Sequence, residues 1–111
     1  MKITRHRTFR AKVTVSVPDG DKQTTSSFTA LFKALSTEDL AEHRLGTIEE
    51  QDAYLQAFLI GWEGLIDDLD GEEKPFEFSE ANRRLLISDV FVRRALLDAY
   101  SQAMLGAKRG N

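Results

Sequence analysis

Residues 8–32, TFRAKVTVSVPDGDKQTTSSFTALF, determine the N-terminal part of the fold. From residue 8 to residue 17, apolar and polar side chains alternate strictly. A period of two with many β-branched residues is typical of a half-buried strand. The same alternation resumes over residues 22–32. Because Pro18-Asp19-Gly20-Asp21 between the two segments has the composition of a turn, the stretch predicts a β-hairpin.

The register of this hairpin follows from which positions are apolar. The apolar side chains occupy odd positions in the first segment and even positions in the second, namely Phe28, Ala30 and Phe32. Both sets share one face only if odd residues pair with even ones, which requires an even number of loop residues. We therefore predict a loop of four residues, 18–21. A lone hairpin is marginal in water, so another element must cover its apolar face.

The rest of the chain has the periodicity of helices. The strongest pattern begins at Thr47-Ile48-Glu49-Glu50, a capping box in which the first and last side chains each accept from the other's backbone amide. Apolar residues then recur at spacings of three, four and seven as far as Ile66. Gly61 and Gly64 lie inside this pattern at a cost of roughly 1 kcal/mol each against Ala. Their presence predicts that another element approaches closely there.

Capping residues before apolar runs mark where helices begin. We expect helices over about 37–44, 47–66, 80–87 and 89–105, begun by Ser36, Thr47, Ser79 and either Ser88 or Asp89. Residues 106–111 should fray. The sequence thus predicts one α+β domain, residues 1–111, in which an antiparallel β-hairpin packs against a C-terminal bundle of three to four α-helices.

Composition excludes several classes of protein. The chain has no cysteine, which rules out disulfides, thiolate metal sites and a cysteine nucleophile and is typical of a reducing cytoplasm. No run of about 18 apolar residues occurs, so we expect no membrane partner. The first 35 residues have a net charge of +5 and the rest −8. The basic part can pair with the acidic remainder or an acidic partner; nucleic acid is less favoured, because no aromatic side chains are interleaved with its cations.

Groups able to carry out catalysis are scarce. The two histidines, His6 and His43, have no metal-ligand neighbour at helical spacing and are interpreted as solvated. No Gly-rich phosphate loop, nucleophile elbow or paired catalytic carboxylate occurs. We therefore predict that the protein is not an enzyme and has no catalytic, cofactor-binding or metal-binding residues.

The acidic turn that follows the long helical pattern matches a calcium loop only in part. With Gly71 at the sixth position of a twelve-residue EF-hand loop, Asp68, Asp70 and Glu77 fall on ligand positions. The first position falls on Ile66, which cannot bind a cation. The stretch is therefore interpreted as a solvated turn without a metal.

Two arginine pairs, Arg83-Arg84 and Arg93-Arg94, each lie on a predicted helix beside apolar positions. We expect them to form solvated faces that make salt bridges with the acidic segments. An anion or nucleic-acid site is the less favoured alternative.

Aromatic side chains gather around the acidic turn. Trp62, the single tryptophan, follows Phe58 on the long helical pattern, and Phe76 and Phe78 come after the turn. We favour a core role, in which these side chains close over the hairpin. The alternative is that part of the group is an exposed docking patch, since exposed apolar patches mark interaction sites. The candidate partner-binding residues are Phe58, Trp62, Phe76, Phe78, Phe91 and Tyr100.

The order of several short motifs resembles the small tail assembly chaperones of long-tailed phages and prophages. Proteins of that family are similar in having a hairpin around Pro-Asp-Gly, then Phe-x-Ala-x-Phe, Gly-Trp, an acidic turn with Gly, Pro-Phe, a polar helix start with Asn, Leu-Leu and a helix ending at an aromatic residue. The matching positions are 18–20, 28–32, Gly61-Trp62, 67–71, Pro75-Phe76, 79–82, Leu85-Leu86 and 92–100. No single motif is specific, and the resemblance lies in their order and spacing over nearly the whole chain.

The resemblance implies a non-enzymatic protein that binds the long, aggregation-prone tape measure protein and keeps it soluble until the tail tube polymerises around it. In many phages a frameshifted, extended form of such a protein recruits the tail tube protein. We therefore expect a homo-oligomer in the host bacterial cytoplasm that is absent from the mature virion. Two alternatives remain: a structural minor tail or tail-completion protein retained in the virion, and a nucleic-acid-binding regulator that uses the basic first third.

Overall fold

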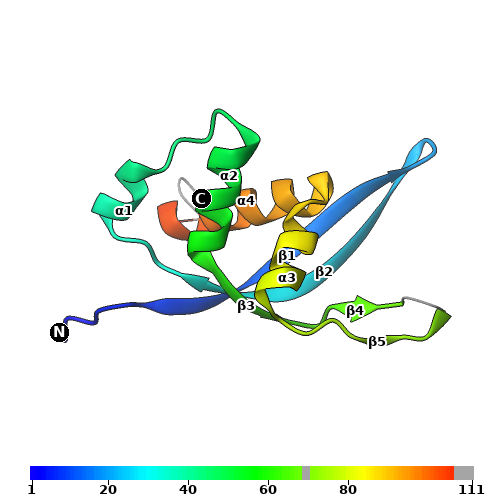
Figure 1. The fold of residues 1–111 in the computed structure, drawn as a ribbon, viewed down its shortest axis with the longest axis horizontal. Helices are drawn as coiled ribbons and strands as arrows, with labels where there is room; N and C mark the ends of the chain where they lie inside the picture. The colour runs from blue at the N-terminus through cyan, green and yellow to red at the C-terminus, as the bar shows by residue number, and fades with distance from the viewer. Residues whose placement is uncertain (69–70, 107–111) are drawn as a thin grey trace.

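The computed structural model describes residues 1–68 and 71–106, and it confirms the mixed α+β fold. Three antiparallel strands form a sheet in the order β1-β2-β3, where β1 is Thr8–Asp19, β2 is Lys22–Lys33 and β3 is Leu59–Glu63. Figure 1 shows that α2 (Ile48–Phe58) and α4 (Val90–Leu105) lie on the same side of this sheet. The two helices supply the cover that the apolar face of the hairpin requires.

The hairpin has a shorter loop than the sequence predicts. Asp19 pairs with Lys22, so the loop contains two residues, Gly20 and Asp21, rather than four. Gly20 has a φ of 67°, and a two-residue loop with Gly at its first position follows the natural twist of paired strands. Pro18 continues the strand instead of starting the turn, which is possible because β1 is an edge strand. Two and four are both even numbers, so odd residues of β1 still pair with even residues of β2, and this prediction is confirmed.

The predicted helix over 47–66 is wrong in its second half. The helix ends at Phe58, and the next five residues form β3, which pairs with β2. Gly61 pairs with Leu31, and a Cβ on this glycine would lie 3.4 Å from the Leu31 side chain. The predicted close approach is therefore real for Gly61, but the approaching element is a neighbouring strand. Gly64 ends the strand with a φ of 85°.

Capping side chains begin the other helices where the sequence predicts. Ser36 accepts a hydrogen bond at the start of α1 (Thr37–Glu42), and Ser79 does so at the start of α3 (Glu80–Ile87). Asp89 caps α4. The prediction for α1 is two residues too long at its C-terminal end, and α3 has its predicted bounds.

A small second sheet lies to one side of the body. It consists of β4 (Ile66–Asp67) and β5 (Lys74–Pro75), which pair antiparallel and are at the right of Figure 1. Asp70 of the calcium-loop interpretation and residues 107–111 of the predicted frayed tail lie outside the described residues. Among the helices that the structure describes, none is both long enough and apolar enough to cross a membrane.

The core contains a cluster of aromatic rings between the sheet and the helices. Phe58 of α2 stacks on Tyr100 of α4, with ring centroids 3.9 Å apart, and Phe32 of β2 meets both rings edge-on. The Tyr100 hydroxyl accepts from the amide of Leu35 at 2.9 Å and donates to the carbonyl of Lys33 at 2.8 Å. Because the hydroxyl makes both bonds, α4 is fixed to the chain that leaves β2.

Burial changes the ionisation of both tyrosines. It raises the pKa of Tyr54 and of Tyr100 above the ordinary value, because the phenolate is desolvated. The neighbouring Tyr100 raises the pKa of Tyr54 further, whereas the bond from the Leu35 amide lowers that of Tyr100. The two phenols are therefore held in their neutral form.

Candidate interaction surface

Two of the six predicted docking residues lie in the core. Phe58 and Tyr100 are each 0% exposed, so neither side chain can contact a partner while the protein is folded. The prediction that they form part of a docking patch is corrected for these two residues. Phe91, in the first turn of α4, is half-buried and lines a surface hollow beside β1.

The other three, Trp62, Phe76 and Phe78, form one group on the surface side of β3. The indole Nε1 of Trp62 donates to the carbonyl of Phe76 at 2.7 Å. The Trp62 and Phe76 rings are stacked with centroids 5.6 Å apart, and Phe78 meets Trp62 edge-on at 4.9 Å. Trp62 thus fastens the extended segment after β5 to the sheet, and Phe78, 37% exposed, is the member open to solvent.

Arg83 is not the solvated side chain that the sequence predicts. Its Nη1 donates to the carbonyls of Gln56 and Leu59 at 3.0 and 2.9 Å, and its guanidinium lies 5.6 Å from the Phe78 ring. The last carbonyls of a helix have no intrahelical donor and carry partial negative charge. Arg83 therefore caps the end of α2 where the chain turns into β3. Its Nε is buried and has no hydrogen-bond acceptor among the described residues.

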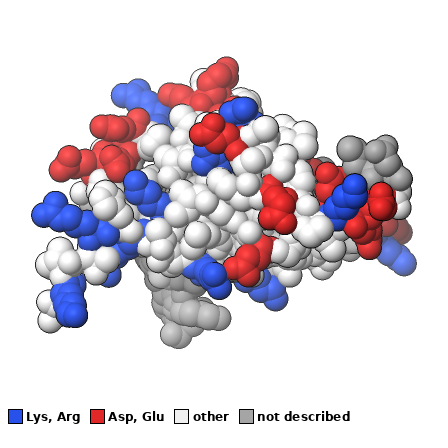
Figure 2. Space-filling view, turned by 60° about the horizontal axis from the view of Figure 1, so that its bottom comes forward, with Lys and Arg blue, Asp and Glu red and all other residues white. Residues whose placement is uncertain are grey.

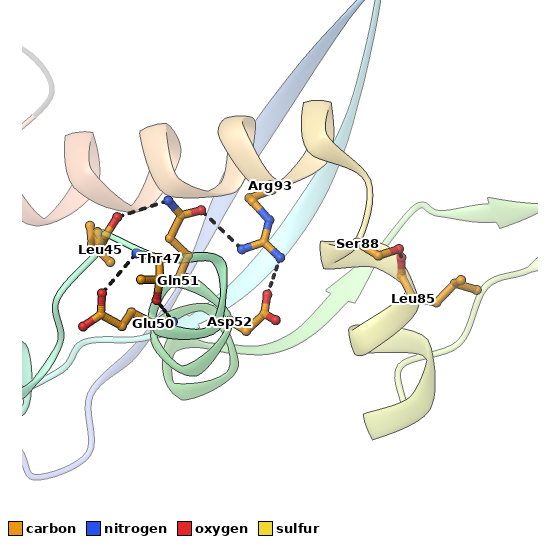
Figure 3. Close-up of polar contacts among 8 residues, drawn as sticks. All are labelled: Leu45, Thr47, Glu50, Gln51, Asp52, Leu85, Ser88 and Arg93. Atoms are coloured by element: carbon orange, nitrogen blue, oxygen red, sulfur yellow. Dashed lines mark hydrogen bonds and ion pairs between the residues drawn. The ribbon is translucent and has the colours of Figure 1, made fainter.

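Arg93 is also buried, with 8% of its surface exposed. Figure 3 shows its guanidinium between α4 and α2, where one nitrogen bonds Asp52 and the other lies 3.4 Å from Oε1 of Gln51. The predicted salt bridge with an acidic segment is confirmed for this arginine, but its predicted solvation is wrong. The same view shows the capping box of α2, in which Thr47 and Glu50 exchange hydrogen bonds as predicted.

Exposed apolar side chains surround this ion pair. Ile48 is 57% exposed and Val90 is 55% exposed, although both are large branched residues. A hollow of about 350 Å³ is lined by both and by Asp52 and Arg93. It adjoins a second hollow of about 230 Å³ that shares Val90 and Arg93 and also contains the half-buried Leu97.

We call Ile48, Val90 and Leu97 the apolar strip. Charged side chains border it, namely Arg84, Arg94 and Asp98. The sequence reasoning missed the strip. Ile48 and Val90 each occupy the first helical position after a capping residue, and their apolar spacing does not show that both side chains are exposed.

Charge is distributed unevenly over the surface. Figure 2 shows basic side chains at the edge that holds the N-terminal segment, acidic side chains above that edge at the upper left, and acidic side chains with a few basic ones around the small second sheet. Arg10 of the basic first third forms an ion pair with Glu63 of β3 at 3.0 Å. Part of the basic segment is therefore paired with the acidic remainder, which was one of the open alternatives.

The two histidines lie in different surroundings. His6 is exposed at a φ of 57°, and His43 is half-buried against the ring of Tyr54 at 5.3 Å. Within residues 1–68 and 71–106, no three His, Asp or Glu side chains are placed to hold one metal ion.

Comparison with known proteins gave no match, whether with protein-family models, with curated proteins or with solved structures.

Proposed function

We propose that this protein is a tail assembly chaperone of a long-tailed phage or prophage, and that it binds the tape measure protein without catalysing a reaction. Two observations support the proposal. One is the order of motifs along the chain, from the Pro18-Asp19-Gly20 hairpin to α4, which resembles that family. The other, and the one that carries the proposal, is the apolar strip between α2 and α4 with its border of arginines and aspartates.

The chemistry of the strip suits a helical client. A tape measure protein consists mostly of long helix with apolar stripes, and such a helix docks by laying its apolar side chains into a groove. Ile48 and Val90 offer apolar area, and the Arg84 side chain beside them can pair with acidic residues on the client's polar face. Each contact is small, so several copies along one client would bind through effective concentration.

The proposal is tested by acidic substitutions in the strip. Ile48→Asp and Val90→Asp place a carboxylate in the first turn of α2 and of α4, where a negative charge is favourable to the helix. The double variant should therefore fold normally, which circular dichroism checks. Co-expressed with the tape measure protein of the same phage, it should leave that client insoluble, whereas the unmodified chain keeps it in solution.

A matched control is Ile66→Asp on the small second sheet. Ile66 is 63% exposed and lies on β4, away from the strip, so this variant should keep the client soluble. If the strip variant solubilises the client as well as the control does, the strip is not the binding surface. If the unmodified chain leaves the tape measure protein insoluble, the chaperone proposal itself is overturned.

One feature favours the alternative of a structural minor tail protein that stays in the virion. The hairpin arm is exposed at every residue from Ser16 to Ser27, and Figure 1 shows it extending away from the helices. An arm of this kind can bind along a neighbouring subunit in a finished assembly. Mass spectrometry of purified virions separates the two functions, because only a structural protein is present in stoichiometric copies.

A further inference from the structure

A groove runs along β1 beside α4 and reaches Gln23 of β2 at the end nearer the hairpin loop. It is formed by two adjoining hollows of about 390 and 210 Å³ between β1 and α4, which share Thr14, Ala95 and Asp98. Gln102 lines the groove beside Lys12, and other α4 residues line it toward the arm. We call it the edge groove. It lies on the other side of α4 from the apolar strip, with Arg94 and Asp98 at the boundary.

The strand beside this groove has an open edge. Within the described residues, β1 pairs only with β2, although it is twelve residues long. Proteins usually block such edges with charges or prolines. Here Lys12 and Pro18 do so only at the limits of the stretch Val13–Val17, which is uncharged and mostly β-branched. Val13 and Val15 are buried in this stretch, whereas Thr14 and Ser16 are exposed and are the residues placed to pair with another strand.

Two opposite charges lie beside the middle of this open stretch. Arg94 and Asp98 are one turn apart on α4, both exposed, and both line the groove next to Thr14. Neither makes an ion pair with a residue that the structure describes. α4 runs antiparallel to β1. The end of α4 lies beside the first half of β1, where Gln102 is near Lys12, and the start of α4 lies beside the second half, where Phe91 is near Ser16.

From this arrangement we infer that two copies of the chain pair through their edge grooves about a two-fold axis near Val15. β1 of each copy would then lie antiparallel to β1 of the other, and the sheet would continue across both. The same axis brings Arg94 against Asp98 of the partner subunit, and Asp98 against Arg94 of the partner subunit. In a two-fold interface a contact and its reverse both occur, so one pair of residues supplies two ion pairs.

A second copy fits this surface better than an unrelated strand would. The open edge is complementary to itself, because Val13–Val17 can pair with the same stretch reversed. Arg94 and Asp98 are complementary in the same way, because a two-fold axis places each of them opposite the other residue of the partner subunit. On either side of Asp98 the groove wall carries the small side chains of Ala95 and Ala99, so the two α4 helices can approach there to about 8 Å.

Charge exchange tests the inference. Arg94→Asp alone sets aspartates against each other across the axis, and Asp98→Arg alone sets arginines against each other. Each single variant should weaken the dimer about tenfold or more in sedimentation equilibrium. The double variant Arg94→Asp/Asp98→Arg should recover the dimer, since each charge again faces its opposite. Circular dichroism establishes that all three are folded.

Cysteine cross-linking gives an independent measurement, because the chain has no cysteine of its own. With the axis at Val15, Thr14 lies opposite Ser16 of the partner subunit, within the Cα separation that a disulfide spans. Mixing Thr14→Cys with Ser16→Cys should give a disulfide-linked dimer faster than a mixture of Thr25→Cys and Ser27→Cys, whose residues are also exposed but lie on β2.

These experiments use the purified chain without a client, so they are independent of the chaperone proposal. A chain that is monomeric at every concentration overturns the inference. So do single charge reversals that dimerise like the unmodified chain, a folded double variant that stays monomeric, and cross-linking no faster than in the control mixture.

Discussion

Two groups of aromatic side chains in this protein are held in different ways. In the inner group, Phe32, Phe58 and Tyr100 are each 0% exposed and touch one another across three elements. In the outer group, a hydrogen bond from Trp62 to a backbone carbonyl and ring stacking hold the segment after β5. Phe58 and Trp62 are close in the sequence, but the chain changes from helix to strand between them, so the two side chains belong to different groups. Burial therefore determines the body of the fold, and directed polar contacts determine its margin.

The largest expected effect of a substitution is in the inner group. Phe58→Ala removes a ring that stacks on Tyr100 at 3.9 Å, and a cavity of this kind costs about 3–5 kcal/mol. The stability of a domain of this size is about 5–15 kcal/mol, so the variant should be close to unfolded. Urea unfolding followed by circular dichroism measures the loss. Phe78→Ala in the outer group should cost less than about 1 kcal/mol, and equal losses would contradict the division into two groups.

Alkaline pH should open the inner group without a mutation. The folded protein has a raised pKa at Tyr54 and at Tyr100, whereas an unfolded tyrosine titrates near about 10. Above that pH the unfolded chain binds fewer protons than the folded one, so stability is complete below about pH 10 and falls as pH rises through the folded pKa values. Phenolate absorbance and circular dichroism should therefore change together.

A single substitution separates the two tyrosines in that titration. Tyr54→Phe should remove half of the phenolate absorbance change and should shift the loss of structure to higher pH, because only Tyr100 then remains to ionise. If absorbance rises near pH 10 while circular dichroism stays constant, the phenols ionise within the folded protein, and the link between their burial and stability is refuted.

The junction between the two groups depends on Arg83. Arg83→Met keeps most of the aliphatic stem but removes the donor to the carbonyls of Gln56 and Leu59. Hydrogen bonds from a charged group contribute about 1.5–3 kcal/mol, and the side chain is half-buried, so we expect a loss of about 2 kcal/mol by urea unfolding. Arg84→Met is the matched control, because Arg84 is the exposed neighbour of Arg83 and makes no such bonds among the described residues. Equal stability of the two variants would show that the cap is unimportant.

Local interactions explain what the sequence could predict. The starts of the helices are marked by side chains that bond an amide two or three residues away, and the strand alternation is visible within ten residues. The parity of the hairpin loop follows from which side chains are apolar. Its length does not, because it depends on how Gly20 adapts to the strand twist.

Distant contacts explain what the sequence could not predict. Leu59 and Trp62 fit a helical spacing as well as a strand, and the choice is made by pairing with β2, about thirty residues earlier. The burial of Arg93 depends on Asp52, 41 residues away. The apolar strip depends on which neighbouring helix leaves Ile48 and Val90 uncovered, and no local pattern contains that information.

The smallest effect tests the outer group directly. Trp62→Phe retains an aromatic ring able to stack on Phe76 but removes the indole donor, which leaves the Phe76 carbonyl without its bond. One neutral hydrogen bond contributes about 1 kcal/mol net, so the loss in urea should be about that size.

The same variant can show where this loss is felt. Since Trp62 holds the segment after β5 and not the inner rings, amide hydrogen exchange should speed up between Phe76 and Phe78 and stay unchanged at Leu96 and Tyr100 of α4. Trp62→Tyr is the control, because its hydroxyl offers a donor at a different reach and should recover little of the protection. If exchange at Tyr100 accelerates as much as exchange near Phe76, Trp62 belongs to the body of the fold, and the two groups are one cooperative unit.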